Sequence, residues 1–169
     1  MAVCEQMNKE KSVIVGVFAD EFERLHCSTC ELIRLIPQSK LYWQPRPSSG
    51  DFPVYSCGEH ALRSAAAVEQ TFGGITANLW DDPFEWTLPE TITTPDAIIS
   101  YIQEAAETRR RGIALLHRDT DLRKEIATAI GERRSIASLL ADTLVRAAHH
   151  HGQAFAVFRL FSDARLPRL

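Results

Sequence analysis

The chain has 169 residues, of which 45% are hydrophobic and 24% are charged, which suits one globular domain with a single core. Nineteen basic and twenty-two acidic residues give a net charge of -3, so the composition gives no reason to expect nucleic acid or an anionic membrane as a partner. Because no apolar run approaches a membrane span and the amino terminus lacks the hydrophobic stretch of a signal peptide, we expect a soluble, cytoplasmic single domain over residues 1–169.

The first half of the chain predicts two long helices separated by a loop. The first helix runs from Ile14 to about Pro37, because apolar residues recur there at spacings of three, four or seven. The prolines, glycine and serine cluster of 39–56 then predict a loop. The second helix begins at Ser56, which forms a capping-box pattern with Glu59, and it ends near Trp80. Its apolar face comprises Cys57, Ala61, Ser64, Val68, Phe72, Ile75 and Leu79.

The second half predicts two further long helices. Thr94 followed by Pro95 is a strong start signal for the third helix, whose inward residues are Ile98, Ile102, Ala105, Ile113 and Leu116. The fourth helix runs from Ile136 to Phe161, with apolar residues alternately four and three positions apart. A short amphipathic segment at 119–130 predicts a short extra helix between them. The sequence therefore predicts an all-α four-helix bundle.

The connection between the second and third helices, residues 81–94, is unusually long for neighbouring antiparallel helices. Fully extended it reaches roughly 45 Å, whereas the second helix is only about 35 Å long at its expected rise. A crossover that leaves these two helices parallel is therefore expected.

Three consecutive histidines stand in the fourth helix. The apolar stripe predicts that only His150 points inward, with His149 and His151 turned to either side. The best placed partner is His60, in the first turn of the second helix. A lone inward histidine is more often a hydrogen-bonded core residue than a metal ligand, so the residues alone leave both interpretations open.

Two segments carry a resemblance to a known family. The stretches "SCGEHALRSAAAVEQTFGG" and "HHHGQAFAVFRLF" resemble the DinB/YfiT-like superfamily, which has a "GEHL"-like histidine in its second helix and an "HxxxHRGQ"-like motif in its fourth. The segment "LIPQSKLYWQPRP" is similar to the one that the family carries between its first two helices. The resemblance implies an up-down-down-up four-helix bundle, a homodimer, and nickel or zinc held by three histidines.

The resemblance also implies a range of activities, and this sequence departs from the family motif at one metal-ligand position. Some members use their metal in reactions of low-molecular-weight thiols such as mycothiol or bacillithiol. By motif, two ligand positions fall on His60 and His150, but the third falls on Arg146. Because a guanidinium is permanently cationic, it cannot act as a ligand here. A metal site of the family's form is therefore not expected.

Two functional hypotheses follow, and the sequence leaves open whether the protein is an enzyme. One is a divalent-metal-dependent thiol-transferase or hydrolase-type enzyme that acts on a small molecule or thiol through an altered site. The other is a metal-free binding or structural homodimer in which Arg146 replaces a ligand histidine. The second hypothesis includes an anion, such as a carboxylate, bound by the arginine beside two neutral histidines.

The cysteines offer a further set of possible ligands. Cys57 lies one turn before His60 and could supply a thiolate to an altered site. Together with Cys27 and Cys30, these residues also match a four-ligand zinc pattern. Both pairs, Cys27 with Cys30 and Cys57 with His60, fall inside helical patterns, however, so free cysteines that pack as small hydrophobes are the favoured interpretation.

The predicted crossover carries three aromatic residues, Trp80, Phe84 and Trp86. They could form the wall of a pocket near His60, or they could cover the side of the bundle. The second interpretation is favoured because large aromatic rings bury much apolar surface area wherever they pack.

Overall fold

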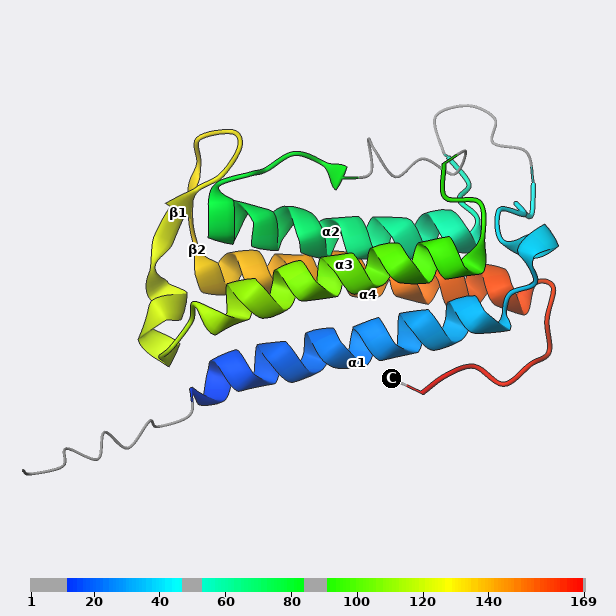
Figure 1. Ribbon diagram of the computed structural model, residues 1–169, viewed down its shortest axis with the longest axis horizontal. Coiled ribbons are helices and arrows are strands. Elements are labelled where there is room, and N and C mark those ends of the chain that lie inside the picture. The colour runs from blue at the N-terminus through cyan, green and yellow to red at the C-terminus, as the bar shows by residue number, and fades with distance from the viewer. Residues whose placement is uncertain (1–11, 47–52, 84–90, 169) are drawn as a thin grey trace, which may run out of the picture.

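The computed structural model describes residues 12–46, 53–83 and 91–168, and its long elements are four helices packed side by side (Figure 1). Their bounds are α1 (Val13–Leu35), α2 (Cys57–Ala77), α3 (Pro95–Ala114) and α4 (Ile136–Arg159). The all-α bundle predicted from the sequence is thus confirmed. In the described ranges, no helix is both long and apolar enough to cross a bilayer.

The helix starts follow local capping chemistry. The Ser56 side chain accepts the Glu59 amide, and the Glu59 carboxylate accepts the Ser56 amide, which forms the predicted capping box. At the start of α3, the Thr94 hydroxyl accepts the amide of Ala97 and Pro95 occupies the first helical position. Helix α2 ends at Asn78, whose left-handed conformation (φ 54°) turns the chain away.

The side-chain contacts give the direction of each helix. Ser64 and Thr71 of α2 bond to Ala147 and Thr143 of α4 respectively, so these two helices are antiparallel. Helices α2 and α3 run the same way, as Figure 1 shows, and Gly112 near the end of α3 lies against the ring of Phe72 near the end of α2. The parallel pair after the crossover is therefore confirmed, and the whole bundle is up-down-down-up.

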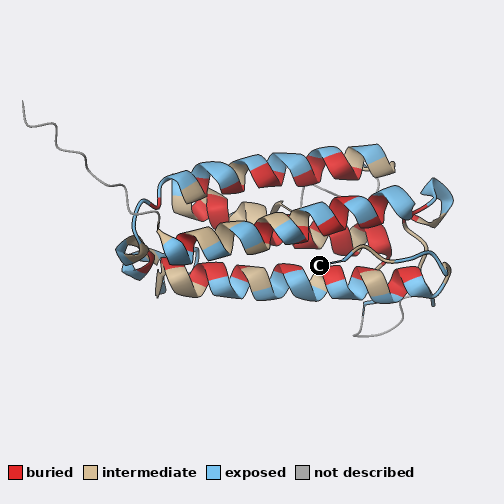
Figure 2. Ribbon diagram, turned by 90° about the horizontal axis from the view of Figure 1, so that it is seen from below, coloured by how far each residue is buried: buried red, intermediate tan, exposed pale blue. Residues whose placement is uncertain are grey.

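The core lies between the helices, on the faces that Figure 2 shows as buried. One cluster surrounds Leu32, Leu62 and Phe158 at the end where α2 begins. The other contains Phe22 and Phe72, whose rings meet edge to face with centroids 5.5 Å apart. Some predicted inward positions are wrong: Ile14 is 51% exposed and Leu79 is 60% exposed. Ile14 lies in the first turn of α1 and Leu79 lies beyond the end of α2, where the neighbouring helices no longer cover them.

The prediction of a helix over 119–130 is largely wrong. The structure has a 3₁₀ turn at Asp119–Arg123 and then a hairpin of β1 (Glu125–Ala127) and β2 (Arg133–Ser135), which pair antiparallel. The Asp119 carboxylate accepts the amides of Ile14 and Val15, so it caps the start of α1 and holds this 3₁₀ turn there. The hairpin turn uses Gly131 at φ 78°, a left-handed conformation that glycine adopts without strain.

Candidate functional site

His60 lies in the first turn of α2, directly after the capping box. Gly58 fixes the position of this turn, because its amide donates to the Leu41 carbonyl and its Cα approaches the Tyr42 ring. A Cβ at residue 58 would lie 2.8 Å from that ring, so the close approach requires glycine. The "GEH" segment thus positions the His60 side chain toward α4.

His60 and His150 meet, as expected from the sequence. Their Nδ1 atoms are 3.3 Å apart, a hydrogen-bonding distance at which one imidazole donates and the other accepts. The ring of Tyr55 packs edge-on against His60, and the ring of His149 packs edge-on against His150. The two histidines therefore form a pair between α2 and α4 with aromatic rings on either side.

The pair is neutral in a cationic environment. Burial lowers the pKa of His60 to about 4, and the charges of His150 and Arg63 act in the same direction. Burial likewise lowers the pKa of His150 to about 4, with further effects of His149, Arg63 and Arg146. Both imidazoles are thus uncharged near neutral pH, and the charges that act on them are positive.

Arg146 is exposed one turn before His150 on α4. It forms no ion pair with any carboxylate in the part of the chain that the structure describes. Its guanidinium therefore contributes an unneutralised positive charge beside the histidine pair, at the position where the resemblance implies a metal ligand.

The prediction that only His150 points inward is wrong. His151 is fully buried, whereas His150 is partly buried and His149 is exposed. The physical reason is that α4 packs against both α1 and α2, so its buried face is wider than the predicted stripe. The buried face of α4 therefore also includes the adjacent row of side chains that contains His151 and Phe158.

His151 is held by hydroxyl groups of α1. Thr29 Oγ1 donates to the Leu25 carbonyl at 2.7 Å, so it can only accept from His151 Nδ1, which is 2.9 Å away. Ser28 Oγ then donates to His151 Nε2 at 3.0 Å. These bonds fix the imidazole in its Nδ1-protonated form, and burial lowers its pKa to about 4. His151 is a structural link between α1 and α4.

No third ligand joins the histidine pair in the described part of the chain. Cys57 is buried and its thiol donates to the Ala154 carbonyl at 3.4 Å, and burial raises its pKa to about 12. Cys30 is also buried, whereas Cys27 is exposed. Within the described ranges, no set of three histidine, cysteine or acidic residues converges to hold a metal. The four-ligand zinc pattern is therefore not assembled, and cysteines that behave as small hydrophobes fit Cys30 and Cys57.

The donor set can be compared with what nickel or zinc requires. A separation of 3.3 Å between the two Nδ1 atoms suits two corners of a tetrahedral zinc site, since zinc–nitrogen bonds of about 2.0–2.1 Å imply a similar spacing. Catalytic sites use about three protein ligands, however, and here two guanidiniums stand in place of any carboxylate or thiolate. The described residues do not fit a three-ligand metal site, and the metal-ligand role of His60 and His150 stays a prediction.

The sequence patterns identified the histidine pair but not several buried or half-buried polar residues. A cavity is lined in part by His26 and Arg109. Their burial could not be predicted from the sequence, because both lie among charged residues that are typical of a solvated helix face. The signal for His151 was present in its spacing of three from Ala154 and four from Ala147. Of the aromatic residues in the crossover, Trp80 packs over Gly74, whereas Phe84 and Trp86 lie outside the described residues.

The comparison with solved structures agrees with this architecture. The fold is similar to the crystal structure of a candidate member of the DinB family from Exiguobacterium sibiricum 255-15, with a TM-score of 0.64. The match has 22% sequence identity and covers 92% of this chain and 97% of the other. No protein-family model matches the chain, and no curated protein matches its sequence. The likeness establishes a shared fold, and the chemistry has to be argued from the residues of the site.

Proposed function

We propose that this protein is a metal-independent binding protein with the DinB fold, and that the histidine pair and Arg146 hold a small oxyanion such as a phosphate or carboxylate group. The observation that carries the proposal is the charge at the site. Two neutral imidazoles lie 3.3 Å apart, and the cations that act on them are Arg63 and Arg146. Such a site favours an anion over a divalent cation.

The donors available at the pair suit an oxyanion. Each neutral imidazole carries one N–H, and the contact between His60 and His150 uses only one of the two. The guanidinium of Arg146 adds up to five N–H donors in a planar fork that matches two oxygen atoms. An anion bound there would also stabilise protonated imidazole, so we expect ligand binding to raise the pKa of His150 from about 4.

The same geometry disfavours a metal-free enzyme that activates a thiol. An imidazole with a pKa of about 4 is a weak base toward a thiol whose pKa is near 8.5. The metal-dependent hypothesis instead needs an ion to lower the pKa of the thiol or water, and the described residues supply two ligands for it. Binding without group transfer is therefore the function that the site supports best.

Metal content tests the proposal directly. We expect untagged protein, purified without chelator, to contain metal well below one equivalent by plasma mass spectrometry. Arg146→His should bind zinc or nickel near one equivalent, because it supplies a third imidazole one turn before His150. Adding His60→Ala to that variant should remove the metal again. A wild-type protein with one equivalent, lost in both His60→Ala and His150→Ala, would contradict the proposal.

Anion binding is the second half of the test. We expect inorganic phosphate to shift the imidazole NMR signals of His60 and His150 in a saturable manner. Arg146→Gln should weaken this binding about tenfold, which is the loss of a charge-assisted contact. Arg159→Gln, which removes an exposed arginine further along α4, is the matched control and should bind as the wild type does. Equal affinity in all three proteins would exclude an anion site at Arg146.

A further inference from the structure

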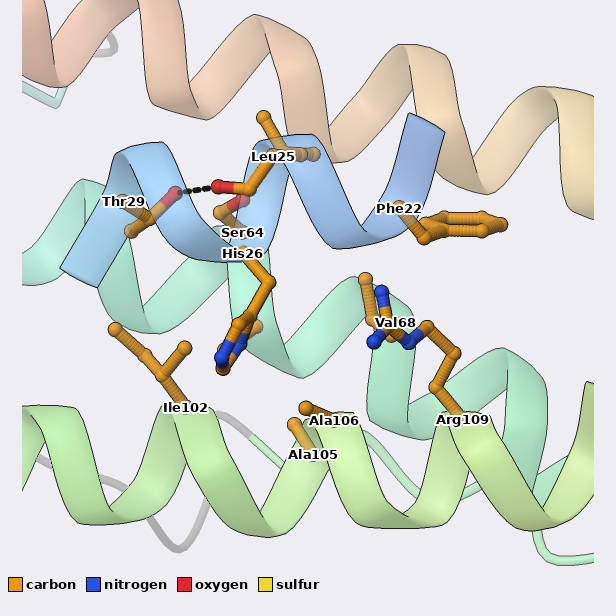
Figure 3. Close-up of a pocket in the computed structure, with 11 residues that line it drawn as sticks. Phe22, Leu25, His26, Thr29, Ser64, Val68, Ile102, Ala105, Ala106 and Arg109 are labelled. Atoms are coloured by element: carbon orange, nitrogen blue, oxygen red, sulfur yellow. Dashed lines mark hydrogen bonds between the residues drawn. The ribbon is translucent and has the colours of Figure 1, made fainter. Parts of the chain in front are cut away.

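A cavity lies between α1, α2 and α3, away from the histidine pair. Small side chains create it, because Ala65 of α2 and two adjacent alanines of α3 leave space where longer residues would meet. Figure 3 shows the two alanines of α3, Ala105 and Ala106. Apolar groups of Phe22, Leu25, Val68 and Ile102 supply most of the walls.

The main polar group of the cavity is a buried arginine with unused donors. Arg109 is 3% exposed, and its Nη2 atom forms an ion pair with the Glu23 carboxylate. Its Nη1 atom is buried and has no hydrogen-bond acceptor in the described part of the protein. Leaving such a donor unsatisfied is costly, more so for a charged group than for a neutral one. The arrangement therefore suits an acceptor that comes from outside the chain.

His26 flanks the same space from α1. In Figure 3 its ring and the Arg109 guanidinium extend into the gap above Ala105 and Ala106. Burial lowers the pKa of His26 and outweighs the opposing effect of Glu23, so the ring is neutral near pH 7 and carries one N–H. The cavity thus has spare donors at two points.

The hydroxyl groups that line the cavity already use their protons. Ser64 Oγ donates to the Ala147 carbonyl, and Thr29 Oγ1 donates to the Leu25 carbonyl. Neither hydroxyl can therefore donate to a ligand without breaking a bond. The groups left to recognise a ligand are the cation and the imidazole, which favour an anionic acceptor.

The size of the cavity limits what can enter. Its open volume is about 30 Å³, and a single water needs roughly 10–15 Å³ in this measure. The space therefore holds two or three waters, or a ligand with only a few heavy atoms. Because most of the wall is apolar, a ligand with a short hydrocarbon part gains from burial that a wholly polar anion does not.

We propose that this cavity is a binding site for a short-chain monocarboxylate, with the carboxylate on Arg109 Nη1 and the hydrocarbon part against Phe22. His26 donates a second hydrogen bond to the carboxylate. Glu23 competes with the ligand for the same guanidinium and so limits its affinity, although Arg110 shares the Glu23 charge. The site is separate from the one proposed at the histidine pair and uses none of its residues.

Propionate is a suitable probe. We expect it to bind with a dissociation constant on the order of 1 mM, a typical scale for so small a ligand, as measured from the side-chain NMR signal of Arg109. Carbon-13-labelled propionate should show NOEs to the Phe22 ring. 1-Propanol and propylammonium have similar size but lack the negative charge, so their binding should be at least tenfold weaker.

Two variants act on the site in opposite directions. Ala105→Val fills the cavity without touching the ion pair and should weaken propionate binding at least tenfold. Ala114→Val, the same change at the exposed end of α3, is the matched control and should leave affinity unchanged. Glu23→Gln removes the competing charge from a half-exposed side chain and should tighten binding several-fold.

The outcomes separate this site from the histidine pair. Arg146→Gln should leave propionate binding at Arg109 intact, whereas Ala105→Val should leave phosphate binding intact. The proposal is overturned if propionate does not shift the Arg109 signal, if propanol binds as well as propionate, or if Ala105→Val and Glu23→Gln both bind as the wild type does. In those cases water occupies the cavity, and Arg109 is a structural partner of Glu23.

Discussion

At the scale of single residues, His151 shows how a buried polar group is satisfied in this fold. Both ring nitrogens have hydroxyl partners on α1, and the side chain has no exposed surface. A protonated ring would need two acceptors, so the Ser28 hydroxyl would have to turn and direct its proton elsewhere. Burial therefore disfavours the charged form, and the present hydrogen bonds fit the neutral one.

This preference for the neutral form predicts a loss of stability in acid. The pKa of His151 is about 4 in the folded protein, against 6.5 as the ordinary value, so between these values the unfolded chain binds a proton that the folded chain does not. The stabilising effect is complete above pH 6.5 and is lost as the pH falls toward 4. We expect the loss in the free energy of unfolding to reach about 3 kcal/mol at the acid end.

Urea unfolding at about pH 7.5 and about pH 4.5 measures this effect. His151→Gln keeps a polar side chain but cannot titrate, so it should lose less free energy of unfolding between the two pH values than the wild type. The exposed His117→Gln should show the wild-type difference. Identical pH dependence in all three proteins would contradict the role assigned to His151.

At the scale of elements, the helix starts could be predicted because their causes are local. Ser56 and Glu59, like Thr94 and Pro95, form their contacts within one turn of the chain. The hairpin could not be predicted in this way. Its position depends on Asp119 contacting the start of α1, more than 100 residues earlier, and on Leu122 packing in the core, and neither contact leaves a local pattern.

The capping box at α2 is expected to contribute measurably to stability. Ser56→Ala should lower the free energy of unfolding by about 1 kcal/mol, because it removes the side-chain oxygen that accepts the hydrogen bond of the Glu59 amide. Ser39→Ala, at an exposed position of the short 3₁₀ helix Gln38–Lys40, should change the free energy of unfolding by a few tenths of a kcal/mol at most. Thermal or urea unfolding would show the difference, and equal stability of the two variants would contradict it.

At the scale of the whole molecule, the loop length predicted the parallel pair of α2 and α3, but not how closely the two helices approach. Gly112 of α3 sits against the Phe72 ring, which itself packs on Phe22 of α1. The spacing of three helices therefore depends on one residue without a side chain. The cavity between the same helices was also beyond sequence reasoning, since it depends on how small residues of different helices align.

Gly112→Ala should therefore destabilise the bundle although alanine is the better helix former. The new Cβ would lie 2.5 Å from the Phe72 ring, and that ring is fully buried and cannot move freely. We expect a loss of about 1–3 kcal/mol from overpacking. Gly152→Ala on α4 meets nothing within 4 Å and should stabilise the protein by up to about 1 kcal/mol. Calorimetry of both variants tests the contrast.

The parallel arrangement of α2 and α3 has an electrostatic consequence for one end of the bundle. Each helix has a macrodipole with its positive end at the amino terminus, and in this topology the amino termini of two adjacent helices share one end of the molecule. His60 lies at that end, in the first turn of α2. Helices α1 and α4 end there, so their negative carboxyl ends offset this potential over the bundle end as a whole. The positive backbone potential is therefore local to the first turns of α2 and α3, where it favours an anion near His60 independently of the arginine side chains.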